Sequence, residues 1–181
     1  MSGNAAVGML MPELIYPAKT PSDYEAFAVL VGEYLSWCRT RYQHDAWFVE
    51  QVFGYQDLDR ELRDLATAYG PPNGRTLLVR SDDQVSAGGA FRRLADGSCE
   101  MKRLYVSERF KGRGIGRRLA QALIDAARMD GFELMRLDTG NLLTEAITLY
   151  RKLGFKDCAP HLDYPQKLLP YLVFMELPLS N

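Results

Sequence analysis

The segment Lys111–Arg118, KGRGIGRR, constrains this chain more than any other part, because it places three glycines at alternate positions between a predicted strand and a predicted helix. Glycine has no Cβ, so the backbone can turn sharply there and main-chain N–H groups can approach a ligand. The first N–H groups of the helix that follows have no partner inside the helix, and that end carries partial positive charge. The segment therefore predicts a diphosphate site, around which Arg113, Arg117 and Arg118 add full charges.

Spacing excludes two common phosphate-binding motifs. A P-loop needs a Lys-Ser/Thr pair after its last glycine, but Gly116 is followed by Arg117 and Arg118. A dinucleotide fingerprint needs Gly or Ala at position 117 when counted from Gly112, or at 119 when counted from Gly114, and these positions hold Arg and Leu. The loop also follows a predicted antiparallel meander, not the first strand of a doubly wound sheet. The ligand of the glycines is therefore neither a P-loop nucleotide nor a Rossmann-type dinucleotide.

Hydrophobic periodicity predicts strands before this segment and alternating strands and helices after it. The predicted helices are Asp23–Arg39 with Ser22 as its N-cap, Asp57–Tyr69, a helix from the glycines to Met129, and one that Asn141 caps and Gly154 ends. The predicted strands cover residues 13–18, 75–80, 84–94, 99–106, 132–139, 155–158 and 171–177. This order predicts an α+β fold around one mixed sheet, with residues 1–181 as a single domain.

Charge is distributed unevenly along the chain. The formal net charge is −1, with 47% hydrophobic and 25% charged residues, which is typical of a soluble globular protein and unfavourable for binding nucleic acid or an anionic membrane. Between Lys102 and Arg118, however, there are seven basic residues and one acid, Glu108. A single basic cluster in a near-neutral chain indicates a small anionic ligand, although an ordinary solvated face and a nucleic-acid patch are alternatives.

The cysteines and the N-terminal sequence indicate the compartment. Cys38, Cys99 and Cys158 are far apart and show no CxxC or Cys/His spacing, so free thiols in a reducing compartment are expected and a metal site is not. The first residues lack a basic start and a long apolar stretch, and no apolar run reaches the roughly 20 residues that a membrane span needs. A cytoplasmic protein is therefore expected.

The glycine segment and a second motif together resemble the GNAT superfamily of N-acetyltransferases. The acyl-CoA signature of that family is Gln/Arg-x-x-Gly-x-Gly/Ala, and Lys111-Gly-Arg-Gly-Ile-Gly fills this frame with Lys at its first position. Downstream, Asn141, Ala146 and the run LYRKLGF at Leu149–Phe155 look like the family's N…A..LY..LGF segment. The strings CEMKRLYV and LDTGN are similar to GNAT proteins whose substrate is unassigned. The resemblance covers roughly Arg75 to Leu177.

The resemblance implies an α/β/α fold whose mainly antiparallel sheet has splayed central strands and helices on both faces. It implies acetyl-CoA as co-substrate, with no metal, and direct transfer of the acetyl group to a primary amine of a small molecule or peptide. By resemblance, Tyr150 is the general acid and the Val106 N–H is an oxyanion donor, while Glu100 is the base with Asp138 as its rival. The implied CoA-binding residues are Leu104, Tyr105, Val106, Lys111, Gly112, Arg113, Gly114, Ile115, Gly116, Arg117 and Asn141.

Several alternatives stay open at this point. A tyrosine on a helical stripe is often only a core residue, and a carboxylate on a strand is often only salt-bridged, so Tyr150 and Glu100 could be structural. The chain could also be a GNAT-like module that binds acyl-CoA without chemistry. The family fold places the acceptor pocket around Trp37–Tyr55 and Ala159–Tyr171, where the aromatic run fits core packing better than a substrate pocket. A homodimer is compatible with the sequence.

Overall fold

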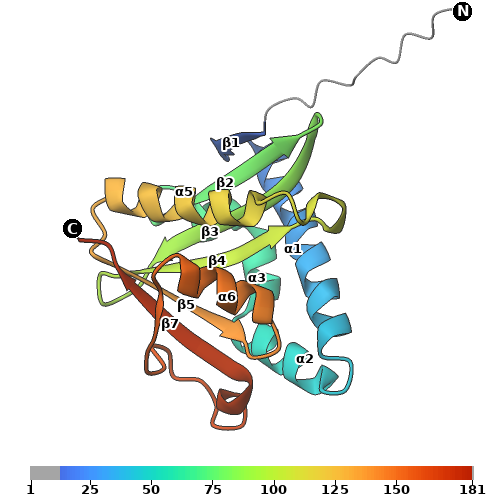
Figure 1. The fold of residues 1–181 in the computed structure, drawn as a ribbon, viewed down its shortest axis with the longest axis vertical. Helices are drawn as coiled ribbons and strands as arrows, with labels where there is room; N and C mark the ends of the chain where they lie inside the picture. The colour runs from blue at the N-terminus through green and yellow to red at the C-terminus, as the bar shows by residue number, and fades with distance from the viewer. Residues whose placement is uncertain (1–12, 181) are drawn as a thin grey trace, which may run out of the picture.

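A sheet of seven strands runs through the computed structural model, which describes residues 13–180 (Figure 1). The strands are β1 (Leu14–Pro17), β2 (Gly74–Ser81), β3 (Gln84–Arg93), β4 (Cys99–Val106), β5 (Leu134–Gly140), β6 (Lys156–Asp157) and β7 (Leu172–Pro178). Their order in the sheet is β1-β2-β3-β4-β5-β7-β6, and all neighbouring pairs are antiparallel except β4 and β5, which are parallel. The predicted mixed, mainly antiparallel sheet is confirmed.

The meander β2–β3–β4 closes through turns that the sequence predicts. Asp82 and Asp83 have left-handed φ values of 49° and 61°, which Asp tolerates better than most residues, and they join β2 to β3 where Ser81 pairs with Gln84. The string CEMKRLYV forms β4 over its whole predicted length, Cys99–Val106. Turn chemistry and alternation of side chains are therefore sufficient to locate this part of the sheet.

A bulge in β4 separates it from β5. Arg103 has a φ of 57°, and the register between β3 and β4 shifts between Gly88 and Ala90, so β4 holds one extra residue there. β4 pairs with β5 only at Cys99 and Glu100. Beyond these two pairs the strands diverge, which confirms the splayed central strands and leaves the β5 side of the second half of β4 without a neighbouring strand.

The first helix, α1 (Pro21–Arg41), begins before the predicted position. Its N-cap is Thr20, whose hydroxyl accepts from the Asp23 N–H at 3.2 Å while the Asp23 carboxylate accepts from the Thr20 N–H at 2.9 Å. Pro21 at the first helical position fixes a favourable φ and needs no N–H partner. The predicted N-cap Ser22 is therefore wrong, because this reciprocal capping pair starts the helix earlier.

Three short helices follow α1, and the sequence predicted them only in part. They are α2 (Ala46–Tyr55), α3 (Leu58–Arg63) and α4 (Leu65–Tyr69). The predicted single helix Asp57–Tyr69 is wrong, because Asp64 has an extended φ of −154° and its carboxylate caps α4 by accepting from the Thr67 N–H. α2 was not predicted, since the aromatic run that contains it was assigned to a loop.

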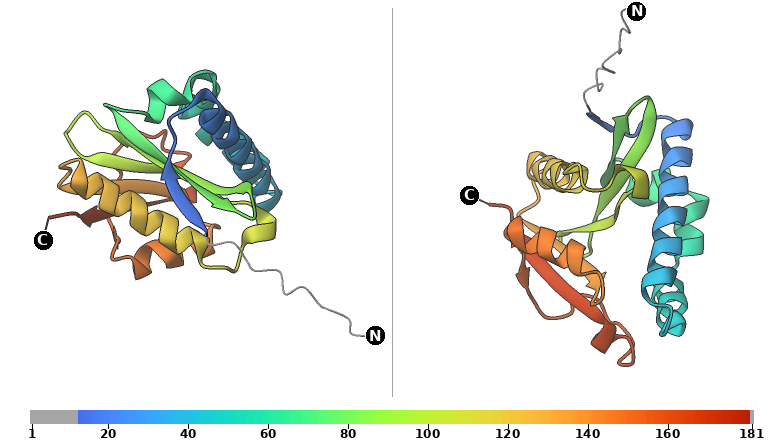
Figure 2. Two further views of the ribbon diagram at one scale, coloured as in Figure 1. Left: turned by 90° about the horizontal axis from the view of Figure 1, so that it is seen from above. Right: turned by 45° about the vertical axis from the view of Figure 1, so that its right-hand side comes forward.

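The helices cover both faces of the sheet (Figure 2). On one face, α1 to α4 enclose a core that includes Phe27 and Tyr69. On the other face, α5 (Ile115–Met129) and α6 (Thr144–Lys152) enclose a second core around Leu119, Leu123 and Met135. Two short 3₁₀ turns, Glu108–Phe110 and Leu169–Tyr171, complete the described chain. No helix among the described residues combines the length and the apolar composition that crossing a membrane requires.

Candidate active site

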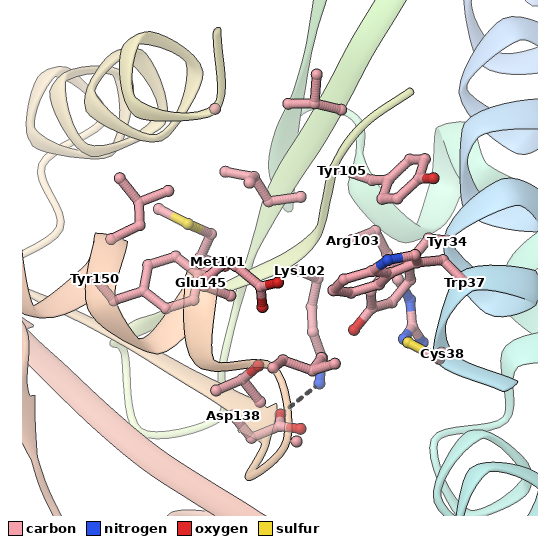
Figure 3. Close-up of a pocket in the computed structure, with 18 of the residues that line it drawn as sticks. Tyr34, Trp37, Cys38, Met101, Lys102, Arg103, Tyr105, Asp138, Glu145 and Tyr150 are labelled. Carbon is pink, nitrogen blue, oxygen red and sulfur yellow. Dashed lines mark hydrogen bonds and ion pairs between the residues drawn. The ribbon is translucent and has the colours of Figure 1, made fainter. Parts of the chain in front are cut away.

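The diverging strands open into a cavity of about 680 Å³ (Figure 3). Residues of α1 and α2 form one wall, the start of α5 and the inner side of α6 form the other, and β4 and β5 lie between them. Four of the predicted site residues do not line the cavity: Glu100, Arg113, Arg117 and Asn141. The predicted residues that do line it are Leu104, Tyr105, Val106, Lys111, Gly112, Gly114, Ile115, Gly116 and Tyr150.

The glycine segment leads directly into α5. Gly112 and Gly114 have left-handed φ values of 79° and 74°, which L-residues rarely adopt, so glycine is required at both positions. Gly114 is the N-cap and has no side chain with which to cap the helix, so the first N–H groups of α5 stay available for a ligand. A Cβ at Gly116 would lie 3.5 Å from Val106 Cγ2, which places Gly116 against the β4 side of the cavity.

Two of the three arginines around the glycines have protein partners at the surface. The Arg113 guanidinium lies 3.4 Å from Asp82, and Arg118 forms an ion pair with Glu13 and donates to the Arg113 carbonyl at 3.1 Å. Arg117 is exposed. These side chains therefore add positive charge near the rim of the cavity without lining it.

The main chain of β4 presents donors towards the gap. The Ser107 N–H donates to the Ser86 carbonyl at 2.9 Å, so these residues form a hydrogen-bonded pair of the β3–β4 ladder. In an antiparallel ladder such pairs alternate with pairs whose main-chain groups point outward. The next pair, Val106 with Ala87, is one whose main-chain groups point outward. The Val106 N–H therefore points away from β3, into the gap between β4 and β5. A ligand arm in this gap could pair with β4 as an added strand would.

Tyr150, on α6, faces the cavity from the side opposite α1 (Figure 3). Its ring packs edge-on against Phe155, with the ring centroids 5.7 Å apart, and the residue is 7% exposed. Burial, and to a smaller extent the charge of Asp138, raise the pKa of the Tyr150 hydroxyl above its ordinary value. The hydroxyl therefore keeps its proton at neutral pH and can donate it.

Glu100 lies beneath the cavity in a buried ionic cluster. Its side chain is 0% exposed and contacts Arg92 at 3.1 Å, Lys102 at 3.3 Å and His161 Nε2 at 3.3 Å. Burial by itself would raise the pKa of this carboxyl, but Lys102, His161 and Arg92 outweigh it and lower the pKa. A carboxylate that is sealed from the cavity and stabilised in its charged form is poorly suited to accept a proton from a bound amine.

Asp138, at the end of β5, is the carboxylate of this cluster that lines the cavity. It accepts from Lys102 Nζ at 2.7 Å and from Gln56 Nε2 at 3.1 Å. Burial would lower the pKa of Lys102, but the charges of Asp138 and Glu100 outweigh it and raise the pKa. Lys102 is therefore a buried ammonium ion that holds Asp138 in place. Figure 3 shows this contact as a dashed line.

The same cluster has the donor types of a cation site. Glu100, Asp138 and His161 each offer one ligand atom, and these three atoms lie within 4.8 Å of one another. The Lys102 ammonium, however, already contacts both carboxylates, at 3.3 Å and 2.7 Å. The positive charge that these carboxylates require is therefore supplied by the chain itself, and the residues fit an ammonium better than a metal ion.

Asn141 has a different position from the one expected. The N-cap of α6 is Leu143, so the predicted capping by Asn141 is wrong. The Asn141 side chain instead links two loops: its Oδ1 accepts from the Tyr42 hydroxyl at 3.0 Å, and its Nδ2 donates to the Pro170 carbonyl at 3.0 Å. Its role in this structure is to hold the end of β5 against α1 and the loop before β7.

The family resemblance places a pocket around residues 37–55, and part of this range lines the cavity, but sequence reasoning missed the helix α2 within it. The apolar residues of α2 that line the cavity are Phe48, Val49, Val52 and Phe53, and they follow the i, i+1, i+4, i+5 spacing of a helix face. That spacing was available in the sequence as a signal. Gln56 and Lys102 could not be assigned in the same way, because their role depends on contacts with β5 across the gap.

Comparison with known proteins agrees with this geometry. A family model described as the acetyltransferase (GNAT) family matches residues 33–155. A protein of Schizosaccharomyces pombe, named as an uncharacterized N-acetyltransferase, is 33% identical over 173 residues, which are 92% of this chain and 95% of that protein. A GNAT-family acetyltransferase structure from Staphylococcus aureus has a TM-score of 0.71 at 16% identity, and covers 93% of this chain and 100% of its own.

A second solved structure is described with its ligand. PaiA N-acetyltransferase from Thermoplasma acidophilum, in complex with coenzyme A, has a TM-score of 0.65 at 18% identity and covers 93% of this chain and 99% of its own. At these identities the two structures show that the fold is shared, including the open, mostly antiparallel sheet.

Proposed function

Because this chain belongs to the GNAT family of acetyltransferases and is an acyltransferase, we propose that it transfers an acetyl group from acetyl-CoA to a primary amine within a ternary complex. The observation that carries the proposal is the gap between β4 and β5, which starts after Glu100 and runs to the glycine segment. A thioester arm lying in this gap would have the unpaired donors of α5 at one end and Tyr150 beside it.

Acetyl-CoA would bind in two parts. The diphosphate would be held by the N–H groups of Gly112–Gly116 and the start of α5, with Lys111, Arg113 and Arg117 supplying charge from the rim. The pantetheine arm would pair with the free main-chain edge of Leu104–Val106. Asn141 contributes by positioning the end of β5, since its side chain is engaged by Tyr42 and Pro170.

The chemical step would use groups that face the gap. The neutral amine attacks the thioester carbonyl carbon, and the Val106 N–H stabilises the oxyanion that forms. When the carbon–sulfur bond breaks, the Tyr150 hydroxyl donates its proton to the departing thiolate. Because a tyrosine hydroxyl is protonated at neutral pH, Tyr150 retains its proton until the thiolate is generated. Burial raises the pKa of Tyr150 further, which keeps the proton in place but makes the hydroxyl a weaker acid.

The proton of the attacking amine would go to Asp138, in place of Glu100. Both carboxylates are paired with Lys102, but Asp138 lines the cavity and Glu100 does not. Glu100 would instead act indirectly, by holding the Lys102 ammonium that in turn fixes Asp138.

We also propose that residues 1–181 act as one domain in the cytoplasm. One sheet connects the first and last strands of the described chain, which supports a single domain. The free thiols of all three cysteines support a reducing compartment.

The test combines binding and turnover on the same protein. Calorimetry with CoA and with acetyl-CoA should give saturable heats, and a panel of primary amines should release free CoA thiol from acetyl-CoA in the presence of the protein. Absence of any CoA binding would contradict the proposal. Binding without turnover across the panel would instead identify a non-catalytic acyl-CoA-binding module.

A further inference from the structure

Three aromatic rings form a compact cluster on the acceptor-side wall of the cavity. Tyr34 and Trp37 belong to α1, and Tyr105 belongs to β4. The ring centroids are 6.3 Å apart for Tyr34 and Trp37, 5.9 Å for Tyr34 and Tyr105, and 6.2 Å for Trp37 and Tyr105. All three residues line the cavity, and Figure 3 shows them together on the side opposite Tyr150. Tyr34, Trp37 and Tyr105 together form the ring cluster.

The ring cluster already holds a cation from the chain itself. Lys111 Nζ lies 4.4 Å from the centroid of the Trp37 ring and 5.2 Å from that of Tyr105. Both distances are within the range of a cation–π interaction. The same ammonium is paired with Glu108, which is exposed. Lys111 is also the first residue of the glycine segment, so its side chain starts beside the proposed diphosphate site.

Most other charges around this part of the cavity are neutralised within the protein. The Arg103 guanidinium is paired with Glu61, and Lys102 with Asp138 and Glu100. Arg41, whose guanidinium lies 5.2 Å from the Trp37 centroid, is paired with Glu145. Among the described residues, the Arg41 guanidinium is the other cation over the Trp37 ring, and its pairing with Glu145 reduces its repulsion of a positively charged ligand once Lys111 leaves the ring cluster.

The ring cluster is separate from the point of attack. Tyr105 and Val106 are consecutive strand residues, so their side chains point to opposite faces of the sheet. Accordingly, Tyr105 packs in the core under α1, and Val106 packs against the core under α5. A positive group held on the rings would thus leave a different nitrogen of the same ligand free to reach the gap beside the Val106 N–H.

We propose that the ring cluster is a binding site for a positively charged group of the acceptor, distinct from the amine that is acetylated, and that Lys111 occupies this site until acetyl-CoA binds. The acceptor class is then an amine with a second cationic centre. The diphosphate would draw the Lys111 ammonium away from the rings, so acetyl-CoA would bind first and open the acceptor site. The assignment of the rings to the acceptor rests on the proposed function.

Tetramethylammonium can test the ring cluster before an acceptor is identified, because it is a small organic cation that cannot be acetylated. The chain has two tryptophans, Trp37 and Trp47. Trp47→Phe leaves Trp37 as the sole tryptophan, and Trp47 does not line the cavity. Two proteins are compared in this background, one that keeps Lys111 and one with Lys111→Met. Each is titrated with tetramethylammonium chloride, with and without saturating CoA, while Trp37 fluorescence is recorded. Sodium chloride at equal ionic strength is the control.

Four affinities are expected to separate into two groups. With Lys111 present and CoA absent, tetramethylammonium should bind weakly; CoA should tighten its binding about tenfold. Lys111→Met should bind it tightly with or without CoA, because the Lys111 ammonium no longer competes for the rings. Equal affinities in all four samples, or no saturable change in any of them, would overturn the proposal.

A second measurement ties the site to the acceptor. Tetramethylammonium should inhibit thiol release competitively against whichever amine the panel selects, and noncompetitive behaviour would overturn the assignment to the acceptor. Failure of the proposed function has a different signature. If CoA does not bind at all, Lys111→Met should still bind tetramethylammonium more tightly than the protein with Lys111.

Discussion

At the residue scale, the Tyr150 hydroxyl is the group whose removal is most informative. Tyr150→Phe keeps the ring that packs on Phe155 and removes only the proposed proton donor. We expect kcat to fall about a hundredfold, as for loss of a general acid, with little change in CoA affinity. Thiol release gives kcat, and calorimetry gives the affinity. Tyr55→Phe is the matched control, because Tyr55 is 44% exposed and does not line the cavity; equal losses in both variants would contradict the assignment.

The raised pKa of Tyr150 makes a second prediction at this scale. A general acid works only while protonated, so its activity is lost as pH rises through its pKa. Burial and the charge of Asp138 raise that pKa above the ordinary value of about 10. The kcat measured with saturating substrates should therefore show no alkaline decline attributable to this group below about pH 10. An alkaline decline near pH 8 in the wild type that disappears in Tyr150→Phe would contradict the raised pKa.

The cysteines test whether transfer is direct. Burial raises the pKa of Cys38, which lines the cavity, to about 11, and that of Cys99 to about 12. Because the thiolate is the reactive form and a raised pKa keeps the thiol protonated, both should resist alkylation at neutral pH. Iodoacetamide at about pH 8 should label the half-buried Cys158 first, as followed by peptide mass spectrometry. Cys38 reacting as fast as Cys158 would instead reveal a nucleophile in the cavity.

At the element scale, local signals predicted some elements well and others poorly. β4 and α5 were located from alternation, apolar stripes and glycines, because these signals lie within the segments themselves. The start of α1 has a local signal, the capping-box spacing of Thr20 and Asp23, which the choice of Ser22 as N-cap overlooks. The break between α3 and α4 depends on the Asp64 cap, whose partner follows only from the backbone geometry. α2 is not predicted although its apolar residues have helical spacing, because the many aromatic residues of this segment also suit the packing of a loop.

The start of α5 can be tested by comparing a substitution at Gly116 with the same substitution at Gly32, a glycine within α1. A Cβ at Gly116 would meet only ordinary contacts, the nearest being Val106 Cγ2 at 3.5 Å, and one at Gly32 in α1 would meet nothing within 4 Å. Both Gly116→Ala and Gly32→Ala should therefore raise the free energy of unfolding, by roughly 0.5–1 kcal/mol. The family signature allows Ala at the position of Gly116, and the added methyl group would make only ordinary contacts with Val106 and Leu149, so neither variant should change CoA affinity by more than about threefold.

Urea unfolding and CoA calorimetry on the two variants check this prediction. A loss of CoA affinity in Gly116→Ala alone would contradict the match of this position to the family signature. A loss in both variants would show an effect that is not local to α5.

At the scale of the whole molecule, the sequence predicted the fold class and the glycine-segment wall of the cavity better than the wall formed by α1 and α2. Glycines, a helix start and a strand edge are contiguous in the chain, so Lys111–Gly116 and Leu104–Val106 could be placed together from order alone. The opposite wall is assembled from α1, α2, β4 and β5. Contacts such as Lys102 with Asp138, 36 residues apart in sequence, have no local signal, so the sequence alone does not separate Glu100 from Asp138 as the proposed base.

Ligand-linked stability tests the arrangement of the whole molecule. A ligand that binds only the folded state stabilises it by about 2.7 kcal/mol at 100 times its Kd, which corresponds to a rise in Tm of about 5–10 °C for a chain of this size. CoA should produce this rise, while pantetheine at the same concentration, which has the arm but no diphosphate, should produce much less. The comparison is informative because the two ligands share the gap between β4 and β5 and differ at the start of α5. If pantetheine stabilises the protein as much as CoA does, the free N–H groups of α5 contribute little, and binding depends on the strand edge of Leu104–Val106 instead.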